Sequence, residues 1–165
     1  TGMMDNWAEM DKEDAAGKEC RMKVLDFIMP HVAKVNYNIA RTMPEVSKSS
    51  ASDGTKLVWV SFFRVENGPV FNDIIKETSS AIKSAEGSVR GTWYTFMGGG
   101  PDSPDYMVST PYKGYAEMDI TRDGVWKIYE NKHGKKKTDE TRAKFRASLE
   151  NSWGYLYSLN EELSN

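Results

Sequence analysis

The spacing of hydrophobic residues in the middle of the chain predicts a strand followed by a helix. Residues 57–65 are rich in β-branched and aromatic residues, which is typical of a strand. Pro69 suits the first turn of a helix, and Gly87 suits its end. Between them, apolar and small residues recur at helical spacing: Phe71, Ile74, Ile75, Thr78, Ile82 and Ala85.

Two further strands are predicted after this helix, at residues 91–97 and 105–111. Residues 98–104 contain three glycines and two prolines, and this composition is typical of a turn. Glycines that hold a phosphate lead into a helix, whereas these lead into a strand. We therefore interpret them as a hairpin connection.

The remaining pattern predicts a short helical turn at residues 113–119 and a helix over residues 125–134. Thr138 is the expected N-cap of another helix, with Leu149 on its inner face. Trp153, Tyr155, Tyr157 and Leu159 alternate with other residues over residues 153–163, which predicts a closing strand, with a continuing helix as the alternative. The element order β-α-β-β-α-β is that of a ferredoxin-like α+β unit.

A short internal repeat extends this picture to the start of the chain. Ala-Glu-Met-Asp occurs at residues 8–11 and again at 116–119, each time after an aromatic residue. Charged helical stretches follow both copies. Residues 1–47 are thus predicted to be a helix-plus-strand piece of an incomplete N-terminal repeat. The first four elements of that repeat are expected outside this chain. Residues 48–54 are the predicted linker, and residues 55–165 the ferredoxin-like unit.

The acidic residues of the repeat are candidates for acid–base chemistry or for helix capping. Glu9 and Glu117 occupy equivalent positions, as do Asp11 and Asp119. Capping and pairing with the helix dipole explain why both copies carry them. We predict the structural role.

The strand–helix–strand–hairpin–strand pattern, followed by residues 111–119 (Pro-Tyr-Lys-Gly-Tyr-Ala-Glu-Met-Asp), resembles the dimeric α+β barrel superfamily. More narrowly, it resembles uncharacterised bacterial proteins built from two such units in tandem. The superfamily includes cofactor-free antibiotic-biosynthesis monooxygenases, haem-binding and haem-degrading proteins, and stress-responsive members. The resemblance therefore implies a fold without selecting one activity.

The predicted strands are apolar on both faces, which has a consequence for assembly. In residues 57–65, Trp59 and Phe63 alternate with Val60 and Phe62. A ferredoxin-like sheet carries helices on one face only, so its other face must be covered or solvated. An exposed aromatic row favours association. We predict a homo-oligomer, or pairing with the missing N-terminal repeat, and a small apolar ligand between the sheets.

Composition argues against a nucleic-acid partner, a membrane span and an internal disulfide. The net charge of −2 gives no reason to expect nucleic acid as a partner. The sequence contains no run of about 18 apolar residues, so no membrane span is predicted. Cys20 is the only cysteine, which excludes an internal disulfide. Localisation is open between the bacterial cytoplasm, the periplasm and secretion after signal removal.

Candidate chemistry rests on the histidines and on an aromatic population. Neither His31 nor His133 has ligand types nearby at metal spacing, so we predict no metal site. His133 lies in a basic run and is expected to be solvated, although haem-degrading members of the superfamily carry a helix-borne histidine. No cofactor is predicted, with haem as the alternative.

The preferred function is a non-enzymatic barrel protein that assembles through its sheet face and binds a small apolar or aromatic ligand. The alternatives are a cofactor-free monooxygenase or isomerase, using groups such as Tyr94, Tyr112 or His133, and a haem-binding module. Aromatic rings with polar tips suit a pocket for a flat ligand. The candidate ligand-binding residues are Trp93, Tyr94, Tyr106, Tyr112, Trp126, Tyr129, His133 and Tyr155.

Overall fold

The computed structural model describes residues 4–12, 15–48, 54–160 and 162. It divides into two compact units, Thr1–Asn36 and Tyr37–Asn165, which are treated separately below. The predicted linker falls largely on residues 49–53, which lie outside the described residues.

The first unit consists of short helical segments. A 3₁₀ helix spans Trp7–Asp11, α1 spans Ala15–Lys23 and continues as a π-helical turn at Val24–Ile28, and a second 3₁₀ turn spans Met29–His31. The side chains described in residues 17–36 are exposed or half-buried. Phe27, for example, is 73% exposed. Helical structure is thus confirmed here, but these side chains form no buried core among themselves.

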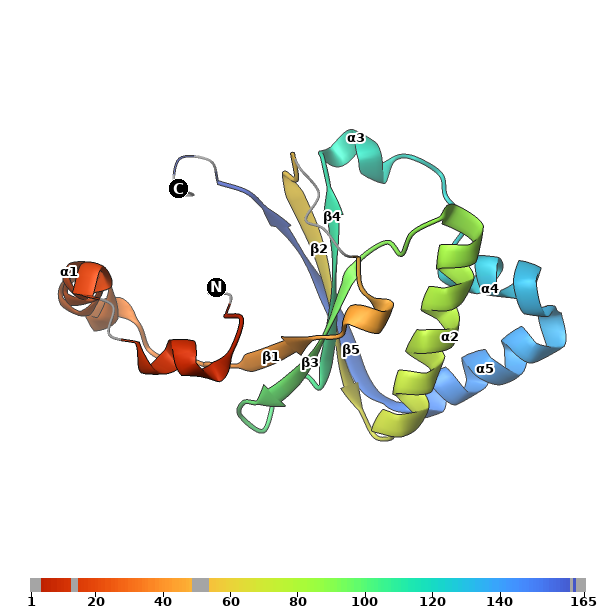
Figure 1. The fold of residues 1–165 in the computed structure, drawn as a ribbon, viewed down its shortest axis with the longest axis horizontal. Coiled ribbons are helices and arrows are strands. Elements are labelled where there is room, and N and C mark those ends of the chain that lie inside the picture. Colours follow the sequence, from red (N-terminus) through yellow and green to blue (C-terminus); the bar gives the residue numbers. More distant parts are fainter. Residues whose placement is uncertain (1–3, 13–14, 49–53, 161, 163–165) are drawn as a thin grey trace. The chain divides into compact units, whose positions relative to one another are not determined.

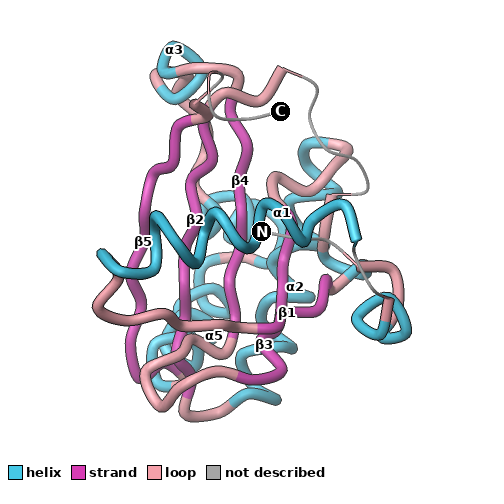
Figure 2. The backbone as a smooth tube through the Cα atoms, turned by 90° about the vertical axis from the view of Figure 1, so that its left-hand side faces the viewer, coloured by secondary structure: helices cyan, strands magenta, loops and turns pink. Residues whose placement is uncertain are grey.

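The second unit is an α+β arrangement with one five-stranded antiparallel sheet. Figures 1 and 2 show its strands side by side. The strand order is β1-β3-β4-β2-β5. The strands are β1 Ile39–Thr42, β2 Leu57–Val65, β3 Thr92–Gly98, β4 Tyr106–Tyr112 and β5 Leu149–Ser158. The helices are α2 Gly68–Glu86, α3 Tyr115–Met118, α4 Val125–His133 and α5 Lys135–Ala147. A 3₁₀ turn at Pro44–Val46 follows β1.

Helix α2 begins and ends as its sequence predicts. The Asn67 side chain accepts a hydrogen bond from the Val70 N–H at 3.1 Å, and Pro69 lies in the first turn. Gly87 ends the helix with φ of 79°, a left-handed conformation that glycine adopts without steric cost. Its N–H donates to the Lys83 carbonyl at 2.9 Å.

The core lies between the sheet and helices α2, α4 and α5, which Figure 1 shows on one side of the sheet. Phe71 and Ile75 of α2 are buried together with Val46. The partly buried residues packed around them are Met43, Phe63, Val65, Trp93, Tyr106, Phe145 and Leu149. A second buried cluster joins α2 to α4 through Ala81, Ile82, Ile128 and Tyr129. The stripe predicted for α2 is therefore its core face from Phe71 to Ile82, whereas Ala85 is exposed because the helix extends beyond its buried contact with α4 there.

The start of α5 differs from the prediction. The helix begins at Lys135, directly after Gly134, whose φ of 79° breaks the chain direction after α4. Thr138 is not the N-cap: it is buried within the helix, and its hydroxyl donates to the Gly134 carbonyl at 2.9 Å. A buried threonine must satisfy its hydroxyl, and the carbonyl one turn earlier does so.

The closing strand also begins earlier than predicted. It spans Leu149–Ser158 rather than residues 153–163, so Leu149 belongs to the strand and not to the preceding helix. Leu149 pairs with Val65 across an irregularity in the β2–β5 register. Residues 149–152 join the strand because they pair with the long neighbouring strand β2. This pairing is a tertiary contact, so the local sequence pattern does not predict it.

The two copies of the repeat have the same local hydrogen bonds. Glu9 and Glu117 each donate their backbone N–H to a carbonyl three residues earlier, at 3.3 and 3.1 Å. Each carboxylate also accepts from a backbone N–H four residues earlier, that of Asp5 at 3.3 Å and that of Lys113 at 2.7 Å. Both glutamate side chains thus accept from a backbone N–H just before their turn, which agrees with a structural role, and the role expected of Asp11 and Asp119 stays a prediction.

Strand β1 follows the first copy, as the predicted helix-plus-strand piece requires. It spans only four residues and pairs with β3 at the edge of the sheet formed by the second unit. Lys48, the first residue of the predicted linker, is held next to the start of β3. Its N–H donates to the carbonyl of Gly91, which directly precedes that strand, at 3.0 Å. The tandem repeat itself stays a prediction.

Candidate functional site

Neighbouring phenylalanines of β2 point to opposite sides of the sheet, as the alternating pattern predicts. Phe63 packs on the helix side, with its ring 5.3 Å from that of Phe71 and 5.5 Å from that of Trp93. Phe62 stacks on Trp153 of β5, with ring centroids 5.7 Å apart and planes 18° apart. Among the described residues of the second unit, no helix covers the Phe62 side (Figure 1). We name this side the open face.

The open face carries aromatic rings from strands β3, β2 and β5, with β4 lying between β3 and β2. Phe62 lies 6.5 Å from Phe96 and 6.2 Å from Tyr155, and Tyr155 lies 6.1 Å from Tyr157. Tyr155 is 55% exposed and Tyr157 is 51% exposed. The sheet register places Tyr94 on the same face, because Tyr94 and Phe62 both pair with Met107. The predicted residues Tyr94 and Tyr155 thus share this surface.

Five other predicted residues lie on the helix side, linked by ring contacts. Trp93 and Tyr106 both contact Phe71, at 6.3 and 5.0 Å. Phe71 stacks on Phe145 at 5.5 Å, which continues the chain of contacts toward the helices. Through Phe145 this chain reaches the residues Trp126, Tyr129 and His133. Since Phe71 and Tyr129 are fully buried, these contacts describe core packing, except at their end, where His133 is exposed as expected.

Tyr129 is the polar centre of the helix interface. Its hydroxyl donates a short hydrogen bond to Glu77 of α2 and lies 3.3 Å from the Thr141 hydroxyl of α5. Burial, followed by the bond to Glu77, raises the pKa of Tyr129 above its ordinary value. The ring of His133 lies 4.4 Å from the Tyr129 ring. These groups join three helices.

Tyr112 lies apart from both ring clusters, in a polar pocket of about 350 Å³. We name this the arginine pocket. It is lined by the end of α2, residues 88–90, the end of β4, α3 and the loop before α4. Its charged lining residues are Lys48, Glu86, Arg90, Lys113, Glu117 and Arg122.

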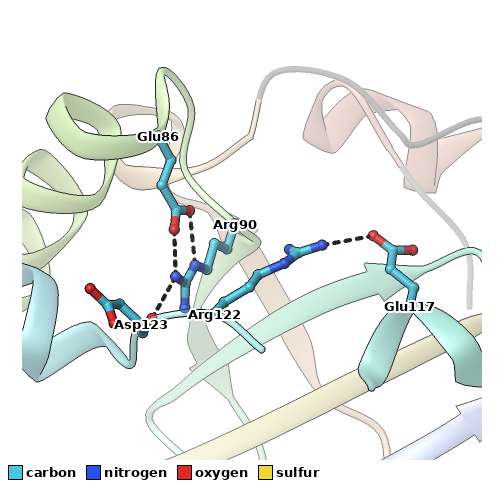
Figure 3. Close-up of polar contacts among 5 residues, drawn as sticks. All are labelled: Glu86, Arg90, Glu117, Arg122 and Asp123. Carbon is cyan, nitrogen blue, oxygen red and sulfur yellow. Dashed lines mark hydrogen bonds and ion pairs between the residues drawn. The ribbon is translucent and has the colours of Figure 1, made fainter. Parts of the chain in front are cut away.

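Arg90 is fixed in this pocket by three hydrogen bonds (Figure 3). Its Nε donates to one Glu86 oxygen at 2.9 Å, and its Nη2 donates to the other at 2.5 Å and to the Asp123 carbonyl at 2.7 Å. The hydrogen bond with Glu86 raises the pKa of Arg90, and the same bond lowers the pKa of Glu86. The guanidinium is thus charged and held in one orientation.

Arg122 extends across the same pocket to Glu117, as Figure 3 shows. Its Nη2 lies 3.3 Å from a Glu117 oxygen. The Lys113 backbone N–H, followed by the side chain of Arg122, lowers the pKa of Glu117. The glutamate that caps α3 therefore also positions an arginine.

The sequence did not indicate the arginine pocket. The four-residue spacing of Glu86 and Arg90 is a local signal for an ion pair at a helix end. Arg122 gives no such signal, since its approach to Glu86 and Glu117 depends on how the loop after α3 returns toward α2. Of the predicted ligand-binding residues, only Tyr112 lines this pocket.

The glycine-rich turn is confirmed as a hairpin connection, because it joins the antiparallel strands β3 and β4. Gly99 has a packing reason to be glycine. A Cβ there would lie 2.2 Å from both the Asn38 Oδ1 and the Ser103 Oγ. These two side chains are hydrogen-bonded to each other at 2.8 Å. The turn thereby connects to the residue that precedes β1.

No protein-family model, curated protein or solved structure matches this chain. Within the described ranges, no group of three His, Cys, Asp or Glu side chains could hold a metal ion. In the same ranges, each helix is too short or too polar to cross a membrane.

Proposed function

We propose that residues 55–165 form a ferredoxin-like unit of the dimeric α+β barrel type, which assembles with a second copy of the chain through its open face. On this proposal the protein is non-enzymatic and holds a small flat apolar molecule between the paired sheets. The strand order β3-β4-β2-β5 and the placement of helices on one side support the unit.

The observation that carries the proposal is the exposure of the open-face rings. Tyr155 and Tyr157 are each more than half exposed, although they stand beside the stacked pair Phe62 and Trp153. Fully burying a large side chain contributes about 1.5–3 kcal/mol, so covering several neighbouring rings provides a substantial driving force. Contiguous apolar surface of this kind is typical of an interaction site.

A second copy suits this face because a two-fold interface brings one patch against itself. Flat tyrosine rings pack against their own kind in offset or edge-on geometry. At the end of β2, Arg64 lies 3.5 Å from Glu150 and 3.9 Å from Asp102, so this margin carries both signs of charge. Mixed charge at the margin avoids like-charge repulsion between copies.

The ligand is proposed from the same rings. Tyr155 and Tyr157 offer an apolar surface with a hydroxyl at its edge, a combination that binds and orients aromatic molecules. The enzymatic and haem-binding alternatives stay predictions. Their candidate groups are dispersed, with Tyr94 on the open face, Tyr112 in the arginine pocket and His133 against Tyr129.

Sedimentation equilibrium tests the assembly. We expect twice the chain mass for the wild type and the single chain mass for the double variant Tyr155→Ser, Tyr157→Ser. The matched control is Tyr115→Ser, because Tyr115 is 66% exposed but lies on α3. A single chain mass for the wild type, or a double variant that still assembles, would contradict the proposal.

Nile red, a neutral dye, tests the ligand. We expect a blue-shifted emission with the wild type and the control, and a loss of this signal in the double variant. Equal emission from all three proteins would remove the ligand part of the proposal while leaving assembly to the sedimentation result.

A further inference from the structure

We propose that the arginine pocket binds a small organic dianion, carrying either a phosphate or two carboxylates. The proposal is independent of open-face assembly, since it rests on different residues. In this pocket two arginines and a tyrosine converge on a cavity of about 350 Å³, which is within the range of small-molecule sites.

The charge of the lining carries the argument. Three cationic side chains of the lining, Arg90, Lys113 and Arg122, stand against two carboxylates, Glu86 and Glu117, which is an excess of one positive charge. Lys48, which has a further interaction of its own, also lines the pocket. The whole chain, in contrast, has a net charge of −2. Cationic side chains are thus concentrated here against the overall balance, and an anion that replaces Glu117 beside Arg122 would meet an excess of two.

The geometry of Arg90 explains how such a site is organised in advance. Its contacts with Glu86 and Asp123 use Nε and Nη2, and within the described part of the chain they leave the Nη1 amino group for a ligand. Its side chain is 22% exposed, so the guanidinium is reached from the pocket but partly shielded from solvent. Orienting the donor before binding lowers the entropy cost of holding an anion.

Arg122 supplies a second, more adjustable donor. Its only ion pair within the described residues is the single 3.3 Å contact with Glu117, and its side chain is 43% exposed. Such exposed pairs contribute about 0–1 kcal/mol, so an incoming anion can replace this contact at small cost. Guanidinium groups bind phosphate and carboxylate groups in pairs of parallel hydrogen bonds.

The apolar part of the lining selects an organic ligand over a bare ion. Tyr112 lines the same pocket as Arg90, and Val89 and Pro111 complete the wall. A phenol ring beside guanidinium groups provides a surface for a carbon skeleton and a hydroxyl for a hydrogen bond. Phenyl phosphate and succinate are therefore suitable probes for the two ligand classes.

The test is an amide NMR titration of the whole chain at constant ionic strength and about pH 7.5, where a phosphate monoester is mostly dianionic. We expect saturable shifts at residues 86–90, 110–113 and 122, with a Kd of about 1 mM or tighter for at least one probe. Saturation with phenyl phosphate alone identifies a phosphate ligand, and saturation with succinate alone a dicarboxylate. Acetate, a monoanion, is expected to bind more weakly than either.

Arg122→Gln is the decisive variant, because removing an exposed ion pair leaves the fold intact and the amide spectrum verifies this. We expect its Kd to rise about tenfold or more, since a charge-assisted hydrogen bond is lost. Lys127→Gln is the matched control: Lys127 forms an exposed 3.3 Å ion pair with Glu130, like that of Arg122 with Glu117, but lies outside this pocket. Shifts that do not saturate, or equal weakening in both variants, would overturn the proposal.

Discussion

Phe62 of β2 and Trp153 of β5 are paired across the sheet, and their rings stack 5.7 Å apart on the face that carries no helix of the second unit. Phe63, the next residue, contacts the buried Phe71 on the opposite face. One strand therefore supports two different apolar surfaces. One is the core, and we assign the other to assembly.

Phe71→Ala is expected to destabilise the second unit by about 3–5 kcal/mol, because Phe71 is fully buried and joins α2 to the sheet and to α5. Urea denaturation measures the loss. Phe27→Ala is the matched control, with an expected change within about 0.5 kcal/mol, since Phe27 is 73% exposed. Similar losses in both variants would show that the core is not where the structure places it.

Tyr129→Phe keeps the ring but removes the hydroxyl that joins α2, α4 and α5. We expect a loss of about 1–3 kcal/mol in the free energy of unfolding, because the buried Thr141 hydroxyl loses a neighbour and Glu77 loses its hydrogen bond. Tyr115→Phe, at an exposed position of α3, is expected to change little. If Tyr129→Phe has the same free energy of unfolding as the wild type, the hydrogen bonds of this hydroxyl make no net contribution to stability.

Alkaline pH gives a second measurement on Tyr129. Its folded-state pKa is raised above 10.0, so the neutral form is the one that folding favours. This contribution is present below the unfolded pKa and is lost as the pH rises through the folded value. Burial also raises the pKa of Tyr106, so ultraviolet titration should show two tyrosines ionising after the exposed ones. Tyr129→Phe should lose one of these two late steps and keep the other. Late steps of unchanged amplitude in the variant would contradict the raised pKa of Tyr129.

Acid pH tests the ion pair of the arginine pocket. The hydrogen bond from Arg90 holds the pKa of Glu86 below its ordinary value of 4.5. A depressed folded-state pKa contributes stability above the unfolded value, and this contribution is lost as the pH falls through the folded value. We expect the urea midpoint of the wild type to fall more steeply below about pH 4.5 than that of Glu86→Gln.

The control for the acid experiment is Glu19→Gln, which alters an exposed glutamate of α1 outside the pocket. It should keep the slope of the wild type. If Glu86→Gln and the wild type have the same acid profile, the Glu86–Arg90 pair does not contribute to stability in the way the geometry indicates.

Most secondary structure could be predicted because its signals are local. The apolar stripe of α2, its Asn67 and Gly87 ends, and the two-sided strand at residues 57–65 are all encoded within a few residues. The errors arose where tertiary contacts override the local pattern. Thr138 resembles an N-cap but is buried against its own helix, and Leu149 is drawn into a strand by its partner Val65.

The open face and the arginine pocket also differ in whether the sequence could predict them. The open face followed from alternation along the strands, since each ring on it is set by a period of two residues. The arginine pocket could not be predicted, because Glu86 and Arg122 are 36 positions apart and come together only through the fold. Aromatic residues such as Trp93 and Tyr106 attracted a ligand-binding prediction, whereas the structure shows them packed around Phe71.

The central claim is that two copies meet through the open face, and an isotope-filtered NOE experiment tests it directly. Isotope-labelled and unlabelled chains are mixed, so that cross-peaks between them report only contacts between copies. We expect such cross-peaks from the rings of Tyr155 and Tyr157, which are more than half exposed in the single chain. Cross-peaks that arise only from α2, α4 and α5, or none at all, would contradict the account.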